Sequence, residues 1–180
     1  MRFLIFLALI SVVFLAPDLV RAASSSDIDA DREQKTGQQV SYIVSGIVSY
    51  SRWPEDIAPS KACVVGSTLY RQALFDQGMN RNSYTWHHYQ ESDHWDVESC
   101  DILYIGLLNS SDRDSLLSGI IGKPVLSISE QDPHCDGGSL ICLNLVEGGS
   151  SFQVNLDAVA RSGIRIHPQV LKLGRELRPN

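Results

Sequence analysis

Residues 101–129 have the sequence DILYIGLLNSSDRDSLLSGIIGKPVLSIS, and this stretch decides the fold class. It begins with a continuous apolar run at 101–108, which is typical of a strand buried on both faces. The polar residues 110–112 favour the start of a helix, and Gly122 favours its end. A second apolar run follows at 124–129. The stretch therefore predicts a strand, a helix and a second strand that lies parallel to the first.

The flanking sequence predicts further elements of the same kinds. An apolar residue recurs at helical spacing from Val40 to Val48, and Pro54 ends that pattern. Glu147-Gly148-Gly149 is a hairpin turn signal between two extended segments. The expected helices are 38–53, 68–77, 110–121, 155–162 and 168–177, and the expected strands are 62–66, 84–89, 101–108, 124–129, 140–146, 151–154 and 164–166. We expect a single-domain α/β fold with a mixed, mostly parallel sheet flanked by helices, and with a C-terminal hairpin and helices.

The first part of the chain predicts export. Arg2 precedes an apolar run at 3–16, and Val20-Arg21-Ala22 places small residues where a signal peptidase cleaves. We expect residues 1–22 to be a cleavable signal peptide and the mature protein to be periplasmic. Residues 23–36 are rich in serine and charge, so we expect a flexible leader. Residues 37–180 then form the single domain.

Composition and motifs exclude several classes of function. The formal charge of the 180-residue chain is -6, so we expect no nucleic-acid binding. The chain lacks the phosphate-binding, dinucleotide-binding and nucleophile-elbow motifs. His88 and His94 are the candidate metal ligands, but their spacing fits no strong signature. The candidate acid–base carboxylates are Asp101, Glu130, Asp132 and Asp157, each better placed as a cap or turn residue. We expect no enzyme activity, cofactor or bound metal.

Four cysteines in an exported chain predict two disulfides. Cys63 and Cys100 lie at the starts of two strands that we expect to be parallel neighbours, so their side chains should meet. Cys135 and Cys142 enclose Asp136-Gly137-Gly138, a segment flexible enough to fold back. A four-cysteine zinc site is the alternative, although the chain has no C-x-x-C pair.

Three titratable or cationic residues favour a small-ligand pocket. Arg165 and His167 lie on the same face of a short extended segment, because side chains alternate along a strand. Arg52 ends the first predicted helix beside Trp53. Together they could bind a small anionic or aromatic ligand. The alternative is that Arg52 and Arg165 pair with carboxylates such as Asp157.

Several stretches together are similar to the YfiR family of periplasmic regulators. The similarity runs from about residue 38 to the C-terminus, and its longest stretch is the most specific. The region 87–96 matches no motif of that family. The stretches are 45–54 (SGIVSYSRWP), 63–66 (CVVG), 100–106 (CDILYIG), 123–130 (KPVLSISE) and 152–164 (FQVNLDAVARSGI), followed by Pro168 and Val170-Leu171.

The resemblance implies a regulatory function. A YfiR-like protein binds the periplasmic domain of a YfiN-type inner-membrane diguanylate cyclase and represses it. A YfiB-type outer-membrane lipoprotein sequesters the repressor, and reducing stress disturbs its fold. Either event raises cytoplasmic cyclic di-GMP and thereby affects biofilm formation and motility. The resemblance also implies a homodimer and supports both disulfides.

The resemblance directs attention to a partner-binding surface on the C-terminal third. Within the predicted helix 155–162, Leu156, Val159 and Ala160 share one face. Ile141 and Leu143 alternate with Cys142 on the adjoining strand, and Gln153 lies on the next strand. We expect this surface to be exposed and apolar. The alternatives are a core role for these residues, a small-molecule binding module with an unrelated partner, and an exported hydrolase or metalloenzyme.

Overall fold

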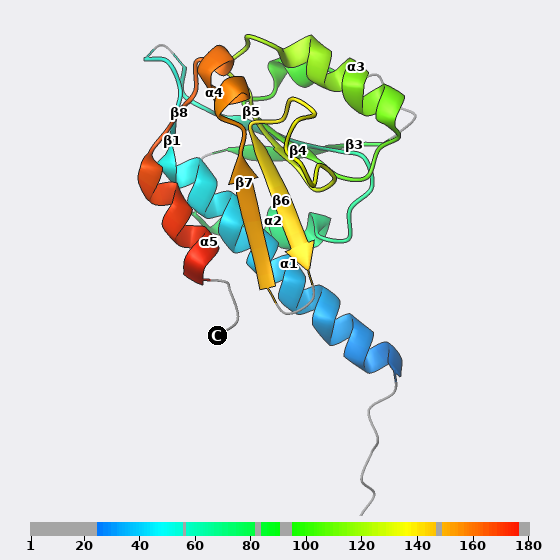
Figure 1. Ribbon diagram of the computed structural model, residues 1–180. Helices are drawn as coiled ribbons and strands as arrows, with labels where there is room; N and C mark the ends of the chain where they lie inside the picture. Colours follow the sequence, from blue (N-terminus) through cyan, green and yellow to red (C-terminus); the bar gives the residue numbers. More distant parts are fainter. Residues whose placement is uncertain (1–24, 56, 82–83, 91–94, 147–148, 177–180) are drawn as a thin grey trace, which may run out of the picture.

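The computed structural model describes residues 25–55, 57–81, 84–90, 95–146 and 149–176, and its centre is a six-stranded sheet (Figure 1). The strand order is β3-β2-β4-β5-β6-β7. All neighbours are parallel except β6 and β7, which form the predicted antiparallel hairpin. The predicted α/β class with a mostly parallel sheet is therefore confirmed. The strands are β2 (Lys61–Val65), β3 (Thr85–Tyr89), β4 (Ile102–Ile105), β5 (Leu126–Ser129), β6 (Ile141–Val146) and β7 (Gly149–Val154).

The remaining elements flank this sheet. A small antiparallel pair joins β1 (Ser51–Arg52) to β8 (Arg165–Ile166). Helix α4 follows β7 directly and lies next to α3 at one end of the molecule (Figure 1). The helices are α1 (Ser25–Tyr50), α2 (Arg71–Arg81), the 3₁₀ turn η1 (Val97–Ser99), α3 (Ser110–Ile120), α4 (Leu156–Ser162), the 3₁₀ turn η2 (Pro168–Lys172) and α5 (Leu173–Glu176).

Alternation along the strands divides the core between the two sheet faces. Successive side chains of a strand point to opposite faces, so Val64 and Tyr104 face one side while Cys63 and Leu103 face the other. The first face packs against the apolar stripe of α1, and the second packs against α3. The continuous apolar strands of the sequence therefore correspond to a sheet covered on both faces.

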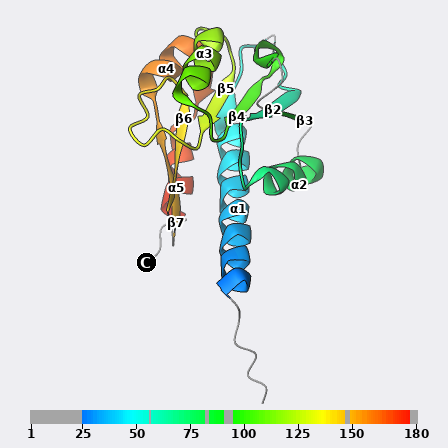
Figure 2. The same cartoon turned by 90° about the vertical axis from the view of Figure 1, so that its right-hand side faces the viewer.

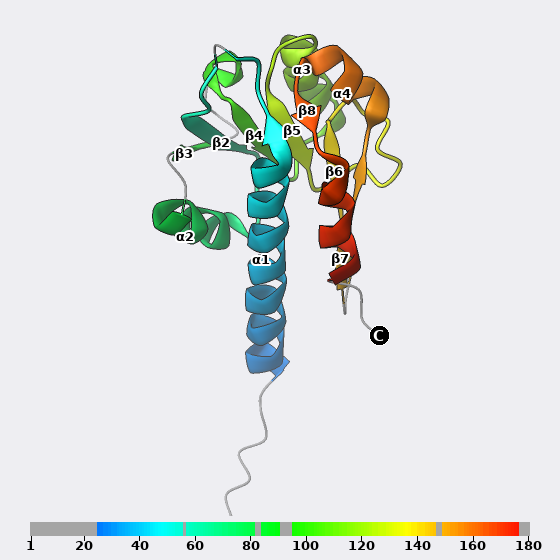
Figure 3. The ribbon, with the colours of Figure 1, turned by 90° about the vertical axis from the view of Figure 1, so that its left-hand side faces the viewer.

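Helix α1 differs from the prediction. It begins at Ser25, so most of the segment 23–36, which we expected to be a flexible leader, is helical. Its first turns extend past the sheet (Figures 2 and 3). Between Ser25 and Thr36 the sequence holds no proline or glycine, and each residue added to an existing helix gains a hydrogen bond. The packed half of α1 can therefore propagate into this polar segment.

The C-terminal helix also differs from the prediction. Residues 168–172 form a 3₁₀ turn, and only Leu173–Glu176 are α-helical. The His167 side chain accepts a hydrogen bond from the Gln169 backbone N–H at 3.2 Å and caps the 3₁₀ turn. Residues 177–180 and the predicted signal peptide at 1–22 lie outside the described residues. Within the described part of the chain, no helix is long and apolar enough to cross a membrane.

Candidate partner-binding surface

Both predicted disulfides are present. Cys63 in β2 bonds to Cys100, which follows η1 and lies two residues before the start of β4, with 6.0 Å between their Cα atoms. The bridge is buried within the core beneath α3. Cys135 bonds to Cys142 at a Cα separation of 5.5 Å and closes a loop between β5 and β6. The four-cysteine zinc site is therefore excluded, because every thiolate is used.

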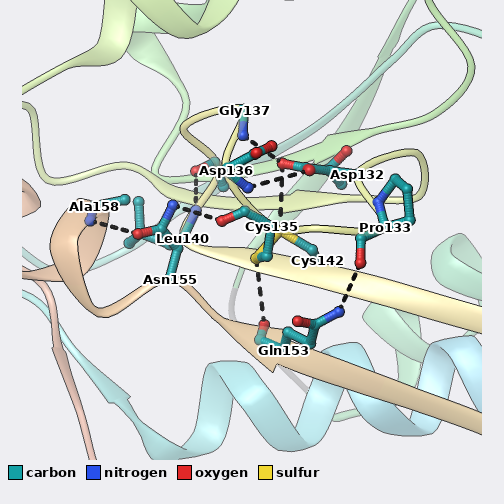
Figure 4. Close-up of a disulfide and its surroundings, with 12 residues drawn as sticks. Asp132, Pro133, Cys135, Asp136, Gly137, Leu140, Cys142, Gln153, Asn155 and Ala158 are labelled. Atoms are coloured by element: carbon teal, nitrogen blue, oxygen red, sulfur yellow. Dashed lines mark hydrogen bonds between the residues drawn. A yellow bond between two sulfur atoms is a disulfide. The ribbon is translucent and has the colours of Figure 1, made fainter.

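Asp132 organises the shorter disulfide loop (Figure 4). Its buried carboxylate accepts the backbone N–H of Asp136 at 3.2 Å and of Gly137 at 2.9 Å. Its own carbonyl accepts the N–H of Cys135 at 3.1 Å. Cys135 takes φ 54°, a left-handed conformation that costs a non-glycine residue free energy. The disulfide and these hydrogen bonds hold that conformation together.

Asn155 connects this loop to α4 (Figure 4). Its side-chain Nδ2 donates to the carbonyl of Cys135 at 2.9 Å. Its Oδ1 accepts the backbone N–H of Ala158 at 2.9 Å and so caps the first turn of α4. Its backbone N–H donates to the Leu140 carbonyl at 2.9 Å. One side chain therefore couples the conformation of the disulfide loop to the start of the helix.

Helix α4 presents an exposed apolar patch. Leu156 has 76% of its surface exposed, and Ala160, one turn later, is also exposed. Val159 is half-buried and packs partly against the main core. Gln153 is exposed on β7 beside this patch, and its Nε2 donates to the Pro133 carbonyl at 3.0 Å. We call these four residues, Gln153, Leu156, Val159 and Ala160, the α4 surface.

Ile141 and Leu143 do not belong to this surface, because the expectation that they are exposed is wrong. Both are buried in the main core, with 0% and 2% of their surface exposed. Strand β6 lies between β5 and β7, and its Ile141 and Leu143 pack in the same cluster as the apolar residues of α1. Alternation placed them correctly on one face of the strand, but that face is covered.

Arg52, Arg165 and His167 all lie on or next to the small β1–β8 pair. Arg52 and Arg165 are direct partners across the β1–β8 pair, so their side chains lie on the same face. Arg52, Arg165 and His167 are all exposed. Arg52 Nη1 donates to the carbonyls of Ser49 and Ser51, at 2.7 Å each. Neither arginine has an ion pair with Asp157, which instead pairs with Arg161.

The crevice at which this topology usually binds ligands is closed. The sheet order reverses between β2 and β4, and ligands of open α/β sheets bind at the carboxyl ends of such strands. Here the two following loops form a bridge in which Ser67 and Leu107 exchange backbone hydrogen bonds, at 3.2 and 2.7 Å. A Cβ on Gly106 would lie 2.3 Å from the Ser67 carbonyl oxygen. The backbones thus occupy the space that a ligand would take.

Glu130 lies beside this closed crevice, at the end of β5. Its carboxylate accepts hydrogen bonds from the hydroxyls of Tyr104, at 2.5 Å, and of Thr68. Burial raises the pKa of Glu130, against the lowering effect of these two hydrogen bonds. Burial and the nearby Glu130 carboxylate raise the pKa of the Tyr104 hydroxyl well above its usual value, so that it remains a donor. The arrangement fixes loops rather than supplying an exposed acid or base.

The other candidate carboxylates are separate from one another. Asp101 accepts the backbone N–H groups of Ser60 and Lys61, at 2.8 and 2.9 Å. No two of the four candidate carboxylates share a hydrogen bond among the described residues. His88 is in contact with Arg71 Nη1 at 3.4 Å, whereas His94 lies outside the described residues. In the part of the chain that the structure describes, no three His, Cys, Asp or Glu residues are grouped to hold a metal ion.

Sequence reasoning missed the role of Asn155. The sequence placed it at the start of a helix, where asparagine is a favoured cap, but gave no sign of its second contact with Cys135.

A comparison with known protein families identifies the fold's relatives. A family model described as YfiR/HmsC-like matches residues 38–175, which is most of the chain.

Proposed function

The chain belongs to the YfiR/HmsC-like family, and we propose that it is a periplasmic regulator of cyclic di-GMP synthesis. It binds the periplasmic domain of a YfiN-type inner-membrane diguanylate cyclase and represses the enzyme. A YfiB-type outer-membrane lipoprotein or reducing stress releases the cyclase. The family match over residues 38–175 carries this proposal, and two disulfides fit an oxidising compartment. The protein itself regulates and does not catalyse.

The α4 surface is the proposed contact with a partner. The exposed Leu156 and Ala160 lie on one helix face next to the half-buried Val159, and these side chains would supply the apolar contacts with the partner. Repression requires that the regulator bind the inactive cyclase conformation more tightly than the active one, because equal affinity shifts no equilibrium. Sequestration by a lipoprotein then acts by competition for free regulator.

The disulfide loop supplies the proposed response to reduction. Cleavage of Cys135–Cys142 removes the covalent restraint on the left-handed Cys135. Asn155 then loses a fixed acceptor at the Cys135 carbonyl, and the same side chain caps α4. Reduction therefore loosens the start of α4 and weakens the α4 surface. The protein need not unfold for repression to end.

The test is the intracellular concentration of cyclic di-GMP. Deletion of the gene should raise it, and the full-length gene should restore the lower level. A version that lacks residues 2–22 should fail to restore it, because repression requires export. An unchanged concentration after deletion, under both oxidising and reducing growth, contradicts the proposal.

A pair of variants tests the α4 surface itself. Leu156→Asp introduces a charge at a position with 76% exposure, so it should fold normally and lose repression. Leu107→Asp is the matched control, because Leu107 is 44% exposed in the loop between β4 and α3. The control should repress as the unmodified protein does. If Leu156→Asp represses as well as Leu107→Asp does, α4 is not part of the interface.

A small-ligand site on the β1–β8 pair is the second candidate function. Like charges directly opposite each other across strands destabilise the pair, and an anion between Arg52 and Arg165 relieves that repulsion. We expect benzoate, as an aromatic anion, to raise the melting temperature, and Arg165→Ala to abolish the shift.

Sedimentation of the mature chain tests the proposed homodimer.

A further inference from the structure

A groove lies between α1 and α2. It has a volume of about 530 Å³ and is distinct from the α4 surface. Helix α2 meets α1 near the middle of α1, and the first turns of α1 extend past the crossing (Figures 2 and 3). Its α1 side is formed by Ala30, Glu33, Gln34, Gly37, Gln38 and Ser41, and its other side by Leu69, Gln72, Ala73 and Asp76.

The crossing of the two helices is tightly packed, which makes the groove a fixed feature. A Cβ on Gly37 would lie 3.3 Å from the Cβ of Ala73. Ser41 Oγ donates to the Ala73 carbonyl at 2.8 Å. The groove lies beside this contact, and its α1 wall extends toward the start of the helix as far as Ala30. Gly37 and Ala73 therefore permit the close approach of the two helices.

The first turns of α1 are short of intramolecular contacts. Residues 28–35 are exposed at every position, so no apolar face of this segment is buried. A helix that is polar on all sides and only a few turns long is marginally stable in water. Leu69, on the opposite wall, has 69% of its surface exposed. A third element that covers both walls would bury Leu69 and stabilise the first turns of α1.

The charge of the groove specifies the occupant. The ionisable residues that line it are Glu33 and Asp76, and no lysine or arginine is among the lining residues. Its small and apolar lining residues are Ala30, Gly37, Ala73 and Leu69. The lining of α1 runs from residue 30 to residue 41, which is about 16 Å or three helical turns. We propose that this groove binds a basic amphipathic helix of a partner protein, with its apolar face on Leu69 and its lysines or arginines on Glu33 and Asp76.

Helix α4 and the first turns of α1, which form part of one groove wall, lie at opposite ends of the molecule (Figure 1). Partners at the two sites would therefore not compete for the same residues. This inference does not depend on the proposed function, because the groove's geometry and charge are independent of what binds α4.

Calorimetric titration of the mature chain with a synthetic Leu/Lys amphipathic helical peptide tests the proposal. A Leu/Glu peptide with the same leucine positions is the reference probe. We expect the Leu/Lys peptide to bind at least about tenfold more tightly. Hydrogen exchange of the amides in 25–36 should slow on binding, because the peptide covers the first turns of α1. Equal binding of both peptides, or no binding of either, overturns the proposal.

Three variants separate this site from general attraction to an acidic protein. Glu33→Lys/Asp76→Lys should weaken Leu/Lys binding at least about tenfold, and so should Leu69→Ser, which alters an exposed side chain and leaves the charge unchanged. Glu55→Lys/Asp114→Lys makes the same change in net charge at exposed residues outside the groove, and should bind as the unmodified chain does. Equal weakening by this control overturns the proposal. A dimer of the peptide-free chain that Glu33→Lys/Asp76→Lys dissociates would assign the groove to a second copy instead.

Discussion

Glu130 directly follows β5, and its half-buried carboxylate is held by the hydroxyls of Thr68 and Tyr104. Because burial raises its pKa in the folded state, the folded protein binds this proton more tightly than the unfolded chain does. The resulting stabilisation is fully present below the unfolded pKa and is lost as the pH rises through the folded pKa. Glu130→Gln should therefore gain stability relative to the unmodified protein as the pH rises from mildly acidic values to neutrality.

Equilibrium urea unfolding at a series of pH values measures this difference. Asp114→Asn is the matched control, since Asp114 is an exposed carboxylate on α3. The control should leave the pH dependence of the free energy of unfolding unchanged. A Glu130→Gln variant whose stability relative to the unmodified protein falls toward neutrality would show that the charged carboxylate stabilises the fold.

Asn155 joins the disulfide loop to α4 through two different atoms, so two substitutions can separate its roles. Asn155→Ala removes both side-chain hydrogen bonds and should cost about 2 kcal/mol in the free energy of unfolding. Asn155→Asp keeps an oxygen for the Ala158 N–H but loses the donor to Cys135, so it should cost less. Urea unfolding compares them.

Hydrogen exchange then tests where each Asn155 variant acts. Asn155→Asp should speed exchange in the loop 135–142 while the first turn of α4 stays protected. Asn155→Ala should speed exchange in both segments. Equal exchange in the two variants would contradict the assignment of separate roles to the two atoms.

At the scale of elements, the loops that close the β2–β4 crevice depend on glycine. A Cβ at position 106 meets backbone rather than a movable side chain, so Gly106→Ala should cost about 3 kcal/mol. Gly119 on α3 is the matched control, because a Cβ there meets no atom within 4 Å. Gly119→Ala should stabilise the protein by about 1 kcal/mol, since alanine favours a helix. Thermal unfolding of both variants measures the contrast.

The outcome distinguishes a closed crevice from an open one. If Gly106→Ala is as stable as the unmodified protein, the two loops separate readily and the crevice could admit a ligand. A large loss of stability means that the loops stay together. In that case the carboxyl ends of β2 and β4 only stabilise the fold, and binding sites lie on the outer surfaces.

At the scale of the whole molecule, the two disulfides should affect stability differently. Cys63–Cys100 closes the longer loop and lies in the core, so Cys63→Ser/Cys100→Ser should cost about 4 kcal/mol. Cys135–Cys142 has a sequence separation of 7, and its removal should cost about 2.5 kcal/mol. Repression in the cell should be lost in the second variant while the protein remains folded.

Cyclic di-GMP measurements and circular dichroism together test this contrast. A Cys142→Ser variant that represses as well as the unmodified protein would remove the shorter disulfide from the proposed redox response. If the Cys142→Ser variant is unfolded, reduction ends repression by unfolding the whole protein and not by loosening α4.

Sequence reasoning reached most of the fold. The succession of strands and helices along the chain follows from the apolar runs and from the glycine and proline residues at their boundaries. These signals act locally. Both disulfides were predicted as well, although Cys63 lies in the middle of β2, opposite Leu103, and not at the start of the strand. The signals at Ser25–Thr36 and after Pro168 were ambiguous, because polar helical segments and 3₁₀ turns share their composition with loops.

The candidate site was only partly predictable. Leu156 and Ile141 look alike in the sequence as apolar residues on amphipathic elements, yet one is 76% exposed and the other is buried. The sequence by itself determined the α/β class, the cysteine pairing and the family to which the chain belongs. Tertiary structure alone decided which apolar face is covered, that the β2–β4 crevice is closed, and that α1 and α2 enclose a groove. Periodicity specifies the face on which a side chain lies, whereas burial depends on the element that packs against that face.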